Sequence, residues 1–78
     1  TVYPNPVSSQ LQIRGWKGAS AEIDLFTMDG RQVLTRSYSA TSGPLTLPVN
    51  TLSNGMYVLR IRDRKGTRSD RKIILVQR

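Results

Sequence analysis

The residue types that most often carry out acid–base or nucleophilic chemistry are scarce in this chain. Its 78 residues include no Cys and no His, which excludes a Ser-His-Asp triad, a Cys-His pair and a zinc site built from these ligands. The five acidic residues are scattered, and Glu22 and Asp24 share a strand face where acids are normally solvated. A Ser-Lys dyad is left open by the composition. We therefore expect no enzyme activity, no cofactor and no metal site.

Positive charge is the second candidate source of function. Residues 1–54 carry four Lys and Arg against three acids, whereas residues 55–78 carry eight against two, within a net charge of +7. Such asymmetry suggests an anionic partner, which could be nucleic acid, acidic polysaccharide, lipid phosphate or an acidic protein surface. Alternatively, basic side chains on edge strands block edge-to-edge pairing. The candidate basic surface comprises Arg60, Arg62, Arg64, Lys65, Arg68 and Arg71.

Residues 52–62 form the stretch around which the other elements are organised. Asn54-Gly55 is a turn signal, and the residues after it alternate as in a strand with one buried face. A helix would place Arg60 beside Tyr57 and interrupt any apolar stripe. The pattern predicts a central strand whose two faces carry Tyr57, Leu59 and Ile61 on one side and Met56, Val58, Arg60 and Arg62 on the other.

Further strands are expected along the whole chain. Prolines on both sides of Asn5 restrict the first residues to a sheet edge, with Tyr3 as the anchor. Six or seven short strands without helical periodicity predict an all-β antiparallel sandwich. Ile73-Ile74-Leu75-Val76 predicts a last strand that is covered on both faces. Besides the central strand, we expect strands at 10–14, 21–28, 31–38, 45–49 (an edge strand, because of Pro48) and 67–77.

The strand at 21–28 alternates cleanly at its start. Its outward positions, Glu22 and Asp24, are expected to face water. Phe26 and Met28 then fall on the outward face, which indicates a β-bulge or a second covered surface. The inward positions are Ala21, Ile23 and Leu25.

A hairpin turn is expected directly after this strand. Asp29-Gly30 is the favoured pair for a type I′ turn, in which both residues need positive φ. The return strand then places Val33 inward and Leu34 near the bulge. Elsewhere, Trp16 is either a lid over one end of the core or an exposed binding aromatic, and the lid is the favoured interpretation.

Four motifs along the chain resemble the hallmarks of one known family. In their order and spacing they look like the type A C-terminal sorting domain of the type IX secretion system of Bacteroidetes. The resemblance covers essentially the whole chain, 2–78. The motifs are Tyr-Pro-Asn-Pro at 3–6, the hairpin at 25–33, the stretch at 52–61 and Arg-Lys-Ile-Ile-Leu-Val at 71–76.

The resemblance implies an immunoglobulin-like sandwich that serves as a secretion address. Residues 1–78 would be a single C-terminal sorting domain, and the start at Thr1 fits a part excised from a longer secreted protein. Family members pass through the periplasm to the outer membrane and the cell surface. Their implied partners are the outer-membrane translocon with its shuttle proteins, and a surface sortase that removes the domain and joins the cargo to anionic lipopolysaccharide.

The resemblance also supplies candidate recognition residues. Gly55 and Tyr57 are interpreted as structural first, because glycine suits the turn into a central strand and the tyrosine ring suits the core. Gln77 stands between the apolar run and Arg78, which departs from the family pattern and leaves open whether this domain is removed or retained. The candidates are Gly55, Tyr57, Leu59, Ile61, Lys72, Ile73, Ile74, Leu75 and Val76.

The rival interpretation is an accessory module whose basic face binds an anionic polysaccharide or a partner protein. Nucleic acid is not expected as a partner, because aromatic residues are not interleaved with the arginine cluster. A steep salt dependence of binding to a polyanion would favour the accessory module. The last strand could also pair with the edge of a receptor sheet, and strand edges leave room for a homodimer.

Overall fold

The computed structural model describes residues 2–4, 6–16, 20–39, 45–63 and 69–77, and these residues form an all-β structure. They contain no helix of the length and apolarity needed to span a membrane. The strands are β1 (Val2–Tyr3), β2 (Gln10–Ile13), β3 (Ala21–Thr27), β4 (Gln32–Tyr38), β5 (Leu45–Pro48), β6 (Gly55–Arg62) and β7 (Ser69–Val76).

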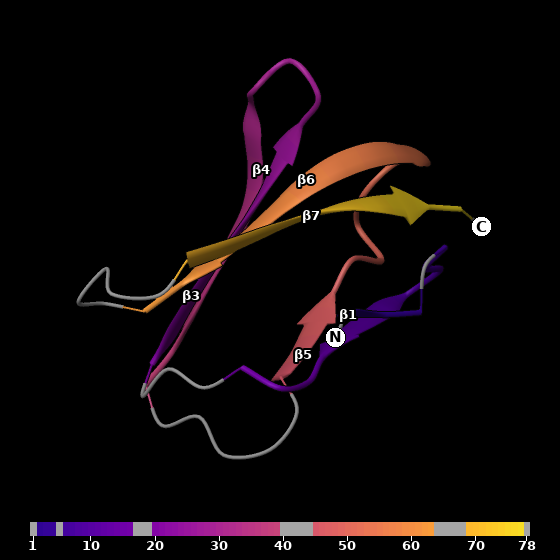
Figure 1. The fold of residues 1–78 in the computed structure, drawn as a ribbon. Coiled ribbons are helices and arrows are strands. Elements are labelled where there is room, and N and C mark those ends of the chain that lie inside the picture. Colours follow the sequence, from indigo (N-terminus) through magenta and orange to yellow (C-terminus); the bar gives the residue numbers. More distant parts are fainter. Residues whose placement is uncertain (1, 5, 17–19, 40–44, 64–68, 78) are drawn as a thin grey trace.

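The strands form two antiparallel sheets that lie as two layers (Figure 1). One sheet has the order β1-β2-β5 and the other has the order β4-β3-β6-β7. This is the strand arrangement of an immunoglobulin-like sandwich in which the fourth strand has joined the sheet of the third, sixth and seventh. The prediction of a central strand is confirmed, because β6 pairs with β3 on one side and β7 on the other.

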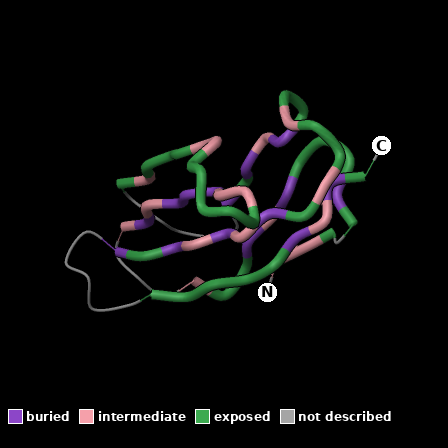
Figure 2. Tube along the Cα trace, turned by 90° about the horizontal axis from the view of Figure 1, so that it is seen from above, coloured by how far each residue is buried: buried purple, intermediate pink, exposed green. Residues whose placement is uncertain are grey.

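The core lies between the two sheets and follows from the alternation of each strand (Figure 2). Trp16 packs against this core while its Nε1 donates to the Ser20 carbonyl at 2.9 Å, so the lid prediction is confirmed. With no disulfide or zinc site built from Cys or His, burial of apolar side chains is the main stabilising term. The fully buried large side chains are Leu11, Ile23, Leu25, Leu47, Leu59, Ile74, Val7, Val49 and Val76.

The β3–β4 hairpin is present as predicted, but its turn type differs. Gly30 has φ of 95°, whereas no non-glycine residue of the described chain has positive φ, which rules out a type I′ turn at Asp29. Instead, the Gly30 N–H donates to the Thr27 carbonyl and the Thr27 N–H to the Arg31 carbonyl, at 2.9 and 2.8 Å. This is a three-residue loop in which Gly30 alone takes the left-handed conformation. A positive φ at Asp29 would have been opposed by its Cβ.

The predicted bulge lies in the same hairpin. The register shifts between Leu25 and Phe26, where Leu25 pairs with Leu34 and Phe26 with Gln32. Val33 is therefore the extra residue, and both Val33 and Leu34 are half-buried against the core. Because the extra residue lies on β4, the β3–β6 pairing continues without a shift through Phe26 and Thr27. That pairing positions the end of β3 and the following turn relative to β6.

Backbone hydrogen bonds join a residue near the start of the chain to the last strand. The Val7 N–H donates to the Leu75 carbonyl at 2.8 Å, and the Gln77 N–H donates to the Val7 carbonyl at 2.9 Å. These bonds belong to a parallel bridge between Val7 and Val76. Tyr3 is half-buried, and its hydroxyl donates to Gln12 Oε1 at 3.0 Å, as expected for the anchor of the first strand.

Tyr57 provides a test of how far the fold depends on its central strand. Its ring is buried and its hydroxyl donates to the Ser53 carbonyl at 2.7 Å, which ties β6 to the turn before it. We expect Tyr57→Ala to lower the free energy of unfolding by about 3 kcal/mol, through loss of ring burial and the cavity left behind. Tyr57→Phe removes only the hydrogen bond and should cost about 1 kcal/mol. Urea unfolding measures both, and equal losses would contradict the ring as the main contributor.

Candidate functional site

The four-stranded sheet has an outer face, which points away from the other sheet. This face carries the side chains of its strands that do not enter the core. We define it by the outward positions of β3, β6 and β7. The strand registers arrange these positions in rows that cross the sheet, with apolar rows beside charged rows. The rows are Met56–Leu75, then Phe26–Val58–Ile73, then Asp24–Arg60–Arg71, and finally Glu22–Arg62–Ser69.

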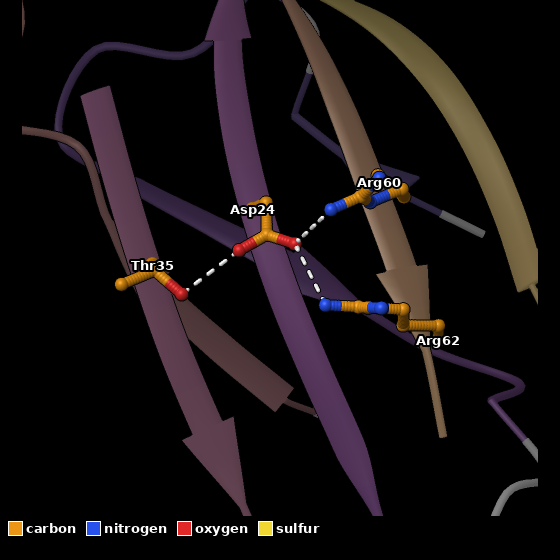
Figure 3. A network of polar contacts seen from close by, with 4 residues as sticks. All are labelled: Asp24, Thr35, Arg60 and Arg62. Atoms are coloured by element: carbon orange, nitrogen blue, oxygen red, sulfur yellow. Dashed lines mark hydrogen bonds and ion pairs between the residues drawn. The ribbon is translucent and has the colours of Figure 1, made fainter. Parts of the chain in front are cut away.

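Asp24 is the centre of the charged rows (Figure 3). Arg60 Nη2 lies 2.8 Å from Asp24 Oδ2, and Arg62 Nη2 lies 4.0 Å from the same oxygen. From β4, the Thr35 hydroxyl donates to Asp24 Oδ1 at 2.8 Å. The expectation that Asp24 faces water is therefore wrong: it points outward, but the side chains from both neighbouring strands reduce its exposed fraction to 4%.

The pKa of Asp24 lies below the ordinary value of 3.8. Burial is the largest single effect and by itself would raise the pKa. The hydrogen bonds from Arg60 and Thr35, with the charges of Arg60 and Arg62, together outweigh burial and favour the ionised carboxylate. The network therefore holds a negative charge beside the two cations Arg60 and Arg62 on this sheet face.

Arg60 links the charged rows to the apolar rows. Its guanidinium carbon lies 5.0 Å from the centroid of the Phe26 ring, within the range of a cation–π contact. Its side chain is 26% exposed, and its buried Nε has no hydrogen-bond partner among the described residues. Arg60 is thus fixed in place by Asp24 and Phe26, while one of its donors is left unsatisfied.

A shallow hollow of about 270 Å³ lies where the two kinds of rows meet. The turn after β3 forms one wall, with Met28 57% exposed. Arg60 and Arg71, which are directly opposite each other on β6 and β7, both line this hollow. Its lining residues are Phe26, Thr27, Met28, Gly30, Val58, Arg60 and Arg71.

The candidate recognition residues fall into two groups in the folded chain. Five side chains are buried in the core, where a partner of the folded domain cannot reach them: Tyr57, Leu59, Ile61, Ile74 and Val76. Lys72 and Ile73 are exposed, Leu75 is half-buried, and Gly55 has a φ of 156° that L side chains rarely adopt. The buried residues therefore serve the fold. Only the residues outside the core are accessible to a partner.

The last strand corrects one expectation. Ile73 was expected to be covered, yet its side chain is 51% exposed, whereas Ile74 and Val76 are fully buried. The reason is that β7 is a terminal strand of its sheet and no described element covers the outer face at Ile73. An apolar run of four residues therefore carries one buried and one accessible side.

The candidate basic surface is divided in a similar way. Arg60 and Arg62 lie on the outer face and interact with Asp24, whereas Arg71 lies beside them without an acidic partner among the described residues. Arg64, Lys65 and Arg68 lie outside the described residues. The described chain contains no group of three or more potential metal ligands. The arrangement is suited to contact with another molecule through apolar and cationic groups.

Two features of the outer face were not predicted. The partnership of Asp24 with Arg60 depends on a register between segments 36 residues apart, which no local pattern reveals. The hollow depends on the β3–β6 pairing, which continues to Thr27 and Tyr57 and so brings the turn with Met28 beside β6. One signal for the outer face was present in the sequence. The alternation of the central strand already predicted Met56, Val58 and Arg60 on the same face.

The Asp24 network allows a mutational test. Asp24→Ala removes the acceptor of Arg60 and Thr35 and leaves a half-buried guanidinium unpaired, so we expect the free energy of unfolding to fall by about 2 kcal/mol. Glu22→Ala is the matched control, because Glu22 is the next outward acid on β3, and it should cost no more than about 0.5 kcal/mol. Chemical denaturation of both variants measures the difference, and comparable losses would contradict the central role of Asp24.

The same network predicts acid sensitivity. Because the pKa of Asp24 is lowered in the folded chain, its contribution to stability is fully present above its unfolded pKa of about 4 and is lost as pH falls through the lower folded value. The wild-type domain should therefore lose stability more steeply than Asp24→Asn below about pH 4. Thermal unfolding from pH 7 to pH 2 tests this, and parallel curves would argue against it.

Comparison with known families found a match that covers nearly the whole chain. A family model described as "Secretion system C-terminal sorting domain" matches residues 1–76. No curated protein and no solved structure shows significant similarity to the chain. The match includes all four motifs noted in the sequence and every strand from β1 to β7. The chain therefore belongs to the family of C-terminal sorting domains of the type IX secretion system.

Proposed function

We propose that this domain acts as a folded address for its cargo, recognised as a surface and not as a linear peptide. The observation that carries this proposal is the burial of the motif residues Tyr57, Leu59 and Ile61 in one core with Ile74 and Val76. Side chains buried in the core cannot contact a partner while the domain is folded. Their function is to hold the strands, and thereby to present the accessible surface to the secretion machinery.

Membership in the family implies interaction with the type IX machinery and secretion across the outer membrane. Within that frame, we propose contacts with the outer-membrane translocon and its shuttle proteins. The periplasm is the proposed route and the cell surface the destination. The domain itself is proposed to perform no catalysis, which fits the absence of His and Cys from the chain.

Processing is the next proposed step. A surface sortase would cut upstream of β1 and join the cargo to anionic lipopolysaccharide. Support comes from the hydrogen bonds of the first residues. Val7 pairs with β7, and the Tyr3 hydroxyl donates to Gln12, so the backbone from β1 onward is bonded into the folded domain. A peptide bond before β1 would then be more accessible than the bonds inside the sandwich.

One observation favours the alternative of an accessory module with a basic binding face. The Arg71 side chain is exposed, and no acidic residue of the described chain forms an ion pair with it. A domain retained on the attachment machinery could hold an anionic polysaccharide through this region and its neighbours. Binding to lipopolysaccharide that falls steeply between low and physiological salt would favour this alternative.

Self-association is proposed through a strand edge. In the described chain, β4 pairs only with β3, whereas the end of β7 already pairs with Val7. Within the four-stranded sheet, the β4 edge is therefore the candidate for pairing with a second copy. Sedimentation over a range of concentrations measures the oligomeric state directly.

The sorting function is tested by fusing residues 1–78 to the C-terminus of a periplasmic fluorescent reporter in a bacterium with a type IX system. We expect the fusion to reach the cell surface, and to stay in the periplasm of a host that lacks the translocon. A variant with Ile74→Asp should also stay in the periplasm, because a charge at this fully buried position prevents folding.

Two controls make the result interpretable. Removing residues 72–78 also deletes the buried Ile74 and Val76, so this truncation tests the fold and not a terminal peptide. A reporter without the domain gives the background of surface signal. Retention of the intact, folded fusion in the periplasm of the competent host would contradict the proposed function.

A further inference from the structure

We propose that the outer face of the four-stranded sheet is the surface that the type IX machinery contacts, and that it receives an acidic segment of a protein partner. An apolar side chain of the partner would occupy the hollow beside Met28 and Val58, and a neighbouring carboxylate would bind Arg71. This inference rests on the proposed sorting function and assigns a surface and a partner chemistry to it.

The apolar half of this face is the first observation. The three large hydrophobic side chains that the structure leaves most exposed are Met28, Met56 and Ile73, at 57%, 52% and 51%. Met56 and Ile73 lie in adjacent rows of the outer face, and Met28 lines the hollow next to them. Clustered exposed apolar side chains typically mark an interaction surface, and methionine adapts its shape to a partner.

The charged half supplies the second observation. Arg60 and Arg71 face each other across β6 and β7, an arrangement of like charges that costs stability unless an anion lies between or beside them. Asp24 forms an ion pair with Arg60 through Oδ2, and the same oxygen also lies near Arg62, so one carboxylate serves two cations. Arg71 therefore remains the available cation at the hollow, since its side chain is exposed and forms no ion pair with an acidic residue of the described chain. A carboxylate of the partner complements this guanidinium.

A protein partner fits this face better than a polyanion. A polysaccharide phosphate would use the cation but would gain nothing from Phe26, Met28, Val58 and Ile73. Protein interfaces, in contrast, combine an apolar centre with arginine and methionine. A second copy of this chain fits less well, since a two-fold contact through the outer face would bring one Arg71 toward the other.

Pairing at the edge of β7 is a less suitable mode of contact. The backbone of Val7 already occupies that edge at Leu75 and Gln77. Nearer the start of the strand, the Asp70 carboxylate accepts from the Arg71 N–H at 3.0 Å. The accessible part of β7 is therefore the side that carries Arg71 and Ile73 on the outer face.

The decisive comparison is Arg71→Glu against Lys72→Glu in the reporter fusion. Both variants change the net charge equally on neighbouring exposed residues, but alternation places Lys72 on the opposite side of β7. We expect Arg71→Glu to lower the surface signal by at least about tenfold, since like charges would meet in the contact, and Lys72→Glu to change it less than about twofold. Neither purified domain should unfold below the wild-type temperature, because both side chains are exposed and Arg71→Glu relieves the like charges opposite Arg60.

A second measurement tests the partner directly. A photo-crosslinking residue in place of Met28 should form an adduct with a type IX component in living cells, and Arg71→Glu should abolish that adduct. The matched position is Thr46, which is exposed on β5 of the other sheet and should give none. An adduct of equal yield from both positions would overturn the assignment of the surface.

The remaining outcomes separate this inference from the function on which it rests. Export of wild type and of both charge variants would overturn the inference and leave the sorting function intact. Equal loss for both variants would indicate attraction to a polyanion by net charge, and a wild-type dimer that Arg71→Glu dissociates would indicate a second copy; either result overturns the inference. Failure of the wild-type fusion to be exported removes the sorting function and the inference together.

Discussion

The register of β6 between β3 and β7 is the constraint on which the rest of the structure depends. Because side chains alternate along a strand, this register determines at once which residues enter the core and which form the rows of the outer face. It places Tyr57, Leu59 and Ile61 inward and aligns Arg60 with Asp24 on β3 and Arg71 on β7. A slip of one residue would send the arginines into the core and the tyrosine into water.

The same constraint explains how a secretion signal can be a fold. A small domain without a disulfide has little stability to spare, so most of its apolar side chains must serve the core. The motif residues of β6 and β7 are used in this way, while the other side of the same strands carries Arg60 in the Asp24 network and the exposed Arg71 and Ile73. Under the proposed function, the signal has its recognition surface only when the domain is folded, which would couple export to completed folding.

The outer face combines interactions of different strength. The Asp24 carboxylate is nearly inaccessible and is bonded on both oxygens, so it acts as a fixed part of the sheet. The side chains of Arg71 and Ile73 lie beside it on a terminal strand and are exposed. A rigid charged centre next to adaptable apolar and cationic groups is the anatomy expected of a docking surface, where preorganisation limits the entropic cost of binding.

Local patterns in the sequence determined the strands, the hairpin, the sandwich and the family, because alternation and turn residues act over a few neighbours. They also identified Trp16 as a lid and the position of the bulge. They did not determine the exposure of Asp24 or Ile73, since both depend on which strands lie alongside and whether a layer covers them. The turn at Asp29-Gly30 shows the same limit, because two turn types accept this dipeptide and the hairpin register selects one. Only the tertiary structure brought Met28, Arg60 and Arg71 around one hollow, because that proximity arises from pairing between segments far apart in the chain.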